Sequence, residues 1–143
     1  MIHPDAPPGS CKGRSRSLLA AFRNAGQGFL VALRSERNLQ IHACCGGLAI
    51  LLGWGLGLTH VEWCLVCAAI AGVITAELLN TALEKTLDRI APELHPRTGQ
   101  AKDIAAAGVA VASCGAVVIG VLLYGPRLYA LLLNYLATGS GAG

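Results

Sequence analysis

The stretch from Ala76 to Asp88 reads AELLNTALEKTLD and closes a long apolar run. On a helix, most of its polar side chains fall on one stripe, while the opposite side is apolar. The stripe carries Glu77, Asn80, Thr81, Glu84 and Asp88. Ionisable groups at membrane depth are costly and usually mark a functional site. We therefore predict that this stripe lines a site; the alternative is a helix that merely emerges into the cytoplasm with its carboxylates solvated.

The composition indicates an all-α integral membrane protein. Hydrophobic residues make up 54% of the chain, charged residues 13%, and the mean hydropathy is +0.56, whereas an ordinary soluble domain carries about 25% charged residues. The 143 residues suffice for three spans with short connections. The net charge of +3 is too small to indicate nucleic acid. Most of the six cysteines lie in apolar runs and are interpreted as packing residues, the Cys64-x-x-Cys67 pair included.

The chain begins with a basic tail, residues 1–16, which lacks the apolar core of a secretory signal. Residues 17–35 are predicted to form an amphipathic helix. Its apolar side includes Phe22 and Phe29, and its polar side includes Arg23. Such a helix is typical of a membrane surface, where arginines meet anionic headgroups and apolar side chains enter the acyl boundary.

Three membrane spans are predicted, over about 39–58, 63–90 and 102–125. Glycine in the first span and alanine in the third favour close helix packing. Pro92 and Pro96 exclude a continuous helix between the second and third spans. Residues 126–143 form an extension: after Gly125-Pro126 an apolar piece as far as Leu136 is too short to span, and we expect it to pack at the membrane interface before a disordered tail.

The distribution of basic residues predicts the orientation. All Lys and Arg except Arg127 lie before the first span or around the connection between the second and third. We therefore expect the N-terminus and this connection to face the cytoplasm, in a multi-pass protein of the inner cell membrane. The acidic stripe then lies at the cytoplasmic boundary, which both cytosolic nucleotide and lipid can reach. A transport site more often lies near the bilayer midplane.

A set of spaced polar residues runs from the stripe into the third helix: Glu77, Asn80, Glu84, Asp88, His95, Lys102 and Asp103. This E-x-x-N-x-x-x-E block, followed by His and Ala-Lys-Asp, resembles the signature of the prokaryotic diacylglycerol kinase family, which includes the undecaprenol kinases. The resemblance covers roughly Phe22 to Leu123. It implies a homotrimeric membrane enzyme, with a surface helix and three spans per subunit, that uses Mg²⁺ and transfers the γ-phosphoryl group of ATP to a lipid alcohol. No P-loop motif occurs, so the ATP site is of another kind.

The resemblance also implies roles for individual residues. Glu77 matches the proposed general base, and Glu36 and Glu84 match carboxylates that hold Mg²⁺ with the phosphates, as suits a cation that takes one or two carboxylates. The positions near the nucleotide are Asn80, Glu84, Glu93, His95, Lys102 and Asp103. The positions near the lipid substrate are Glu36, Asn38 and Glu77. The hinge departs from the family at Gln40, where arginine is common.

Two other classes of function stay open on the residues alone: a small cation or drug exporter, and a noncatalytic membrane scaffold. The first has no need of an acidic cluster at the cytoplasmic end, and the second leaves Glu77 without a purpose. From the residues alone, Lys102 and Asp103 are equally well explained as a structural ion pair. Between the two lipids, the Glu36-Arg37-Asn38 hinge with His42 resembles undecaprenol kinases somewhat more than diacylglycerol kinases.

Overall fold

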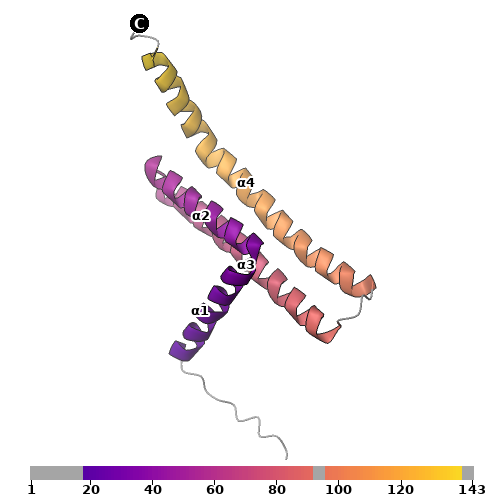
Figure 1. Ribbon diagram of the computed structural model, residues 1–143. Helices are drawn as coiled ribbons and strands as arrows, with labels where there is room; N and C mark the ends of the chain where they lie inside the picture. The colour runs from indigo at the N-terminus through magenta and orange to yellow at the C-terminus, as the bar shows by residue number, and fades with distance from the viewer. Residues whose placement is uncertain (1–17, 92–95, 140–143) are drawn as a thin grey trace, which may run out of the picture.

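The computed structural model describes residues 18–91 and 96–139, and its regular structure is entirely helical. The helices are α1 (Leu18–Ser35), α2 (Arg37–Gly55), α3 (His60–Ile90) and α4 (Pro96–Gly139). Figure 1 shows α2 lying along α3, α4 running back along α3, and α1 leaving the bundle in another direction. The predicted all-helical architecture is confirmed. The basic tail and residues 140–143 lie outside the described residues.

Each connection between helices follows from local chemistry. Glu36 adopts an extended conformation (φ −106°, ψ 112°) and separates α1 from α2. Gly57 has φ +65°, a left-handed conformation that favours glycine, and it turns the chain from α2 into α3. α3 ends at Ile90, the next residue, Ala91, precedes Pro92, and α4 begins at Pro96. The predicted break at the two prolines is confirmed, because a residue before proline is disfavoured in the helical region.

The start of α3 is fixed by a capping box. The Thr59 backbone N–H donates to the Glu62 carboxylate over 2.8 Å, and the Glu62 N–H donates to the Thr59 hydroxyl over 3.4 Å. These bonds satisfy two donors that a helix N-terminus leaves unpaired. α3 therefore begins at His60, three residues before the predicted start of the second span.

The largest difference from the sequence prediction is in α4, which continues through Pro126 to Gly139 instead of ending at Gly125. It also begins at Pro96, before the predicted 102. Proline removes one helical hydrogen bond, but it is tolerated in membrane helices where neighbouring groups satisfy the freed carbonyls. Pro126 has no N–H to donate to the Leu122 carbonyl, and beside it the Arg127 guanidinium donates to the Leu123 carbonyl over 2.9 Å and to the Glu62 carboxylate over 2.8 Å. These contacts hold the helix on both sides of the proline.

The core lies between α2, α3 and α4 and consists of Leu58, Val66 and Tyr124. The Tyr124 hydroxyl donates to the Ala49 carbonyl over 2.8 Å, which ties α4 to α2. α2 approaches α3 closely at Gly46, where an added Cβ would lie 3.2 Å from Ile70 Cγ2. Small residues therefore allow the close packing predicted for the first span.

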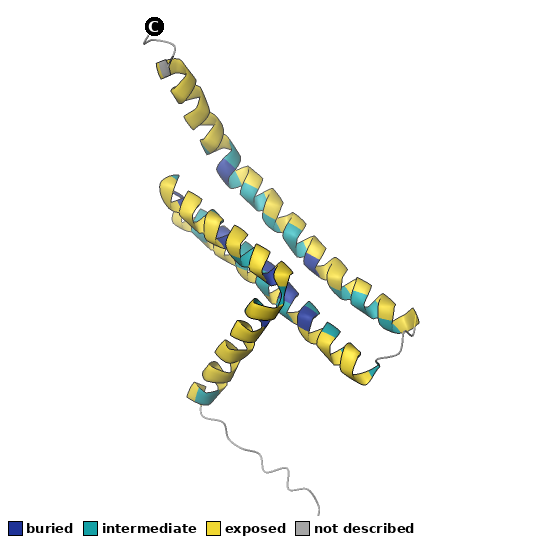
Figure 2. Ribbon diagram, viewed as in Figure 1, coloured by how far each residue is buried: buried dark blue, intermediate teal, exposed yellow. Residues whose placement is uncertain are grey.

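Most large apolar side chains are exposed, as Figure 2 shows along every helix. Among the described residues, α3 and α4 are long and apolar enough to cross a membrane, and only 17% and 6% of their most apolar windows are buried. So little burial excludes a soluble core as the explanation of these apolar surfaces. α2 ends at Gly55 rather than 58 and is less apolar over the length of a span, because Arg37, Asn38, Gln40 and His42 occupy its first two turns. Its membrane crossing stays a prediction.

Candidate active site

The carboxylate of Glu77 is buried at the start of the acidic stripe. Glu77 is 2% exposed, and Thr81 on the next turn is 7% exposed. Its Oε2 atom has no hydrogen-bond partner among the described residues. An unpaired buried acceptor costs about 1–3 kcal/mol. This oxygen is therefore free to accept a hydrogen bond from a bound molecule.

Asn80 and Glu84 lie on the same side of α3, one turn further along. The Asn80 amide donates from Nδ2 to Glu84 Oε1 over 2.9 Å, and Glu84 is half-buried. Asn80 Oδ1 is buried and has no partner among the described residues. This pair therefore presents a carboxylate and an unpaired amide oxygen, both of them hard ligands of the kind that Mg²⁺ takes.

Glu36 is held against α3 by contacts that link distant parts of the sequence. Its carboxylate forms an ion pair with Lys85 at 2.9 Å and accepts a hydrogen bond from the Ser35 hydroxyl over 2.8 Å. The hydrogen bond from Lys85, together with that from Ser35, lowers the pKa of Glu36 below its usual value. Lys85 follows Glu84 directly, so Glu36 lies at the level of Glu84 along α3, although the side chains of adjacent helical residues point about 100° apart.

The described residues contain no group of three or more His, Cys, Asp or Glu side chains able to hold a metal ion by themselves. A magnesium site that shares its ligands with nucleotide phosphates needs only one or two carboxylates. Glu36 and Glu84 fit that requirement, with Asn80 Oδ1 as a further oxygen. In this structure the Glu36 carboxylate is paired with Lys85.

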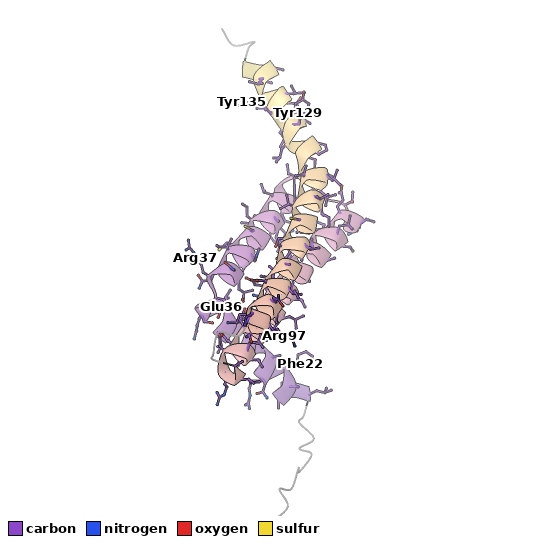
Figure 3. All side chains as sticks on the ribbon, turned by 90° about the vertical axis from the view of Figure 1, so that its right-hand side faces the viewer. Phe22, Glu36, Arg37, Arg97, Tyr129 and Tyr135 are labelled. Atoms are coloured by element: carbon purple, nitrogen blue, oxygen red, sulfur yellow. The ribbon has the colours of Figure 1, made fainter. Side chains whose placement is uncertain are left out.

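Lys102 forms an ion pair with Asp88, which ties the start of α4 to the end of α3. The two side chains are 34% and 65% exposed, so this pair contributes little to stability. Asp103 and Asn38 are exposed. Glu93 and His95, predicted near the nucleotide, lie outside the described residues. Figure 3 places Glu36 at the end of the bundle where Arg97 lies, away from the tyrosines of α4.

Gln40, the departure from the family hinge, has a definite contact. Its Nε2 atom donates to the Leu33 carbonyl over 3.0 Å and reaches the Arg34 carbonyl at 3.5 Å. The last carbonyls of a helix lack partners within the helix. Gln40 therefore caps α1 and fixes its direction relative to α2.

An apolar cavity of about 320 Å³ lies between α2, α3 and α4. Val73, one turn before Glu77, lines it on α3. The polar side chains in its lining include His42 and Ser113, and Ser113 Oγ is buried without a partner among the described residues. The cavity therefore places a hydrocarbon environment one helical turn from the buried carboxylate.

Sequence reasoning missed Lys85, Ser35 and Ser113. Lys85 follows the Glu84 carboxylate in sequence, but its partner Glu36 lies on the other side of the first predicted span. No local pattern pairs residues that far apart. Ser113 sits among small residues of α4 and carries no spacing signal.

Comparison with known proteins identifies similar chains. A family model described as prokaryotic diacylglycerol kinase matches residues 23–124. The undecaprenol kinase of Bacillus subtilis is 38% identical over 108 residues, which cover 76% of this chain and 88% of that protein. The diacylglycerol kinase of Synechocystis sp. is 31% identical over 141 residues, covering 93% and 81%. That of Haemophilus influenzae is 35% identical over 109 residues, covering 75% and 92%.

Proposed function

The chain belongs to the prokaryotic diacylglycerol kinase family and is a lipid kinase, and we propose that it transfers the γ-phosphoryl group of ATP to undecaprenol at the cytoplasmic boundary of the membrane. Family membership removes the exporter and scaffold alternatives. The observation that carries the proposal is the buried, unpaired carboxylate of Glu77 one turn from an apolar cavity. A lipid alcohol has an apolar chain that suits the cavity and a hydroxyl group that can donate to the Glu77 carboxylate.

In the proposed reaction, the lipid hydroxyl donates its hydrogen bond to the Glu77 carboxylate. The hydroxyl oxygen attacks the γ-phosphorus, the bond from this phosphorus to the β,γ-bridging oxygen breaks, and the hydroxyl proton passes to Glu77. ADP leaves with the bridging oxygen. A positioned carboxylate suits this role because general base catalysis requires hydrogen-bond reach to the proton that is removed.

Glu36 and Glu84 are proposed to hold Mg²⁺ through carboxylate oxygens. When bound, this ion neutralises phosphate charge, which is the main requirement of phosphoryl transfer. The contact between Asn80 and Glu84 keeps the Glu84 carboxylate oriented. Lys102 is proposed to exchange Asp88 for a phosphate group, since its exposed ion pair is weak.

The choice of undecaprenol over diacylglycerol has two supports. The Bacillus subtilis undecaprenol kinase shares 38% identity with this chain, against 31% and 35% for the two diacylglycerol kinases above. The cavity lining is almost wholly apolar. A polyprenol brings a single polar group, whereas diacylglycerol also brings two ester groups that lose hydrogen bonds in apolar surroundings.

The test compares both lipids with purified protein in the same mixed micelles, with ATP and Mg²⁺. We expect lipid phosphate from both, with the larger kcat/KM for undecaprenol. A larger value for diacylglycerol would reject the substrate proposal and leave the kinase assignment intact. The Glu77→Gln protein provides the control for product formed without the proposed base.

A further inference from the structure

The last part of α4 lies beyond residues 23–124, the stretch that the family model matches. Figure 1 shows α4 running past the ends of α2 and α3, and Figure 2 shows this part exposed on all visible sides. Its large apolar side chains are between 45% and 75% exposed: Leu128, Tyr129, Leu131, Leu132, Leu133, Tyr135 and Leu136. We call residues 127–139 the α4 extension. So much apolar surface requires an apolar environment.

Two ion pairs between α3 and α4 give the position of the α4 extension relative to the membrane. Asp88 pairs with Lys102 at one end, and Glu62 pairs with Arg127 at the other. Along α4 the two basic residues are roughly 38 Å apart at the helical rise per residue. A bilayer measures about 30 Å across its hydrocarbon core and about 40–45 Å with its headgroups. The two ion pairs therefore fit the two headgroup regions, and the α4 extension lies past the second.

The α4 extension is too short to cross the membrane again, because its 13 residues span roughly 20 Å as a helix. It is instead amphipathic. Arg127, Asn134 and Thr138 fall on one stripe about 40° wide at 100° per residue, and leucines and tyrosines occupy the broad remainder. A narrow polar stripe with a wide apolar face is typical of a helix that lies in a membrane interface.

The ion pair fixes which way the polar stripe faces. Because the Arg127 guanidinium reaches Glu62 on α3 at 2.8 Å, the stripe begins on the side of α4 that faces α3. When the α4 extension tilts away from α3, this side turns toward water and the opposite, apolar side turns toward lipid. The tilt begins past Arg127, because the contacts of Arg127 with Leu123 and Glu62 hold the helix at Pro126.

We propose that the α4 extension is an interfacial anchor, whose apolar face lies in the phospholipid surface at the end of the bundle opposite the ion pair of Asp88 and Lys102. The phospholipid surface is the expected partner because the α4 extension continues a helix that is itself apolar enough to span the membrane. Tyrosine suits the depth, since it concentrates at membrane–water interfaces. Figure 3 shows Tyr129 and Tyr135 together at this end of α4, far from Glu36.

The anchor is tested by spin labelling of the full chain in vesicles of phosphatidylethanolamine and phosphatidylglycerol. The native cysteines are replaced, and single labels are placed at Leu132→Cys on the apolar face and Asn134→Cys on the polar stripe. Collision rates are measured with oxygen, which concentrates in lipid, and with a nickel chelate, which stays in water. Both positions are exposed, and the lipid kinase activity of each labelled protein confirms that it is folded.

We expect the ratio of oxygen to nickel collisions to be several-fold higher at Leu132→Cys than at Asn134→Cys. High nickel rates at both positions would place the α4 extension in water and overturn the proposal. Low rates with both reagents at Leu132→Cys would show that protein, such as a second copy of this chain, covers the apolar face. High oxygen and low nickel rates at both positions would mean that the segment lies within the membrane core.

Discussion

At the scale of single residues, the most informative feature is the difference between two carboxylates. Glu77 is buried with an unpaired oxygen, whereas Glu36 is satisfied by Lys85 and Ser35. The unpaired group is suited to accept a proton from substrate. The paired group must exchange a lysine for a cation before it can serve as a ligand. The two residues therefore call for different tests.

Replacing Glu77 by glutamine keeps the shape of the side chain and removes its ability to accept a proton. We expect turnover to fall by a factor on the order of 10² or more, with the protein still folded. Glu62→Gln makes the same change at the other end of α3 and should have a much smaller effect on turnover. Near-normal activity in folded Glu77→Gln protein would exclude this residue as the general base.

Replacing Glu36 by glutamine tests its role in holding Mg²⁺. If Glu36 and Glu84 share one ion, each single glutamine variant should raise the magnesium concentration needed for half-maximal rate, and the double variant should cost less than the two together. If Glu36 only pairs with Lys85, its loss should cost at most about 1 kcal/mol of stability. A magnesium titration of Glu36→Gln that overlays the parent curve would rule out the shared ion.

At the scale of helices, two ion pairs join α3 and α4, and together with α2 these helices line an open apolar cavity. The cavity stays at a fixed distance from Glu77, because α3 carries both Glu77 and part of the cavity lining. Small residues, which include Ala116 and Gly120, form part of the cavity wall on α4. Larger side chains there reduce the space without touching the acidic stripe.

Ala116→Leu should therefore compete with the lipid chain for the cavity. We expect a higher KM for lipid, by about tenfold if the variant removes about 1.4 kcal/mol of binding, and little change in the KM for ATP. Ala110→Leu is the matched control, since Ala110 lies on the same helix but is exposed and outside the lining. If both variants changed the KM for lipid equally, the cavity would not be the site that binds the lipid chain.

At the scale of the whole molecule, one chain places far apart the residues predicted to contact nucleotide and those predicted to contact lipid. Lys102 pairs with Asp88, which lies three turns beyond Glu77 and roughly 16 Å away along the helix axis. If Glu77 of one subunit and Lys102 of a neighbouring subunit form one site, the two residues can lie close together despite their separation within each chain. We propose that the active enzyme is a trimer with sites shared between subunits.

Mixed trimers of Glu77→Gln and Lys102→Ala chains test this assembly. If the two residues of each site come from different subunits, an equal mixture should recover about one quarter of wild-type activity, because one site in four then has both native residues. Sites built within single chains recover nothing, since every chain carries one defect. Verified heterotrimers without activity would therefore reject shared sites.

The sequence determined the local features of this protein, because helical periodicity and backbone restrictions act within a few residues. The acidic stripe around Glu77, the break at Pro92 and Pro96 and the amphipathic character of α1 follow from spacing and residue type alone. The E-x-x-N-x-x-x-E block with Lys102 and Asp103 was sufficient to identify the family. The roles of individual site residues stay predictions, to be decided by the experiments above.

Only the tertiary structure decided the features that depend on residues far apart in the chain. Local rules ended the third span at Pro126, yet Arg127 pairs with Glu62 and the helix continues. No local rule predicts the partner of Glu36 either, and the packed helices give it Lys85. Both outcomes have one physical reason: the free energy of a proline or a carboxylate depends on which distant groups the packed helices bring within hydrogen-bond reach.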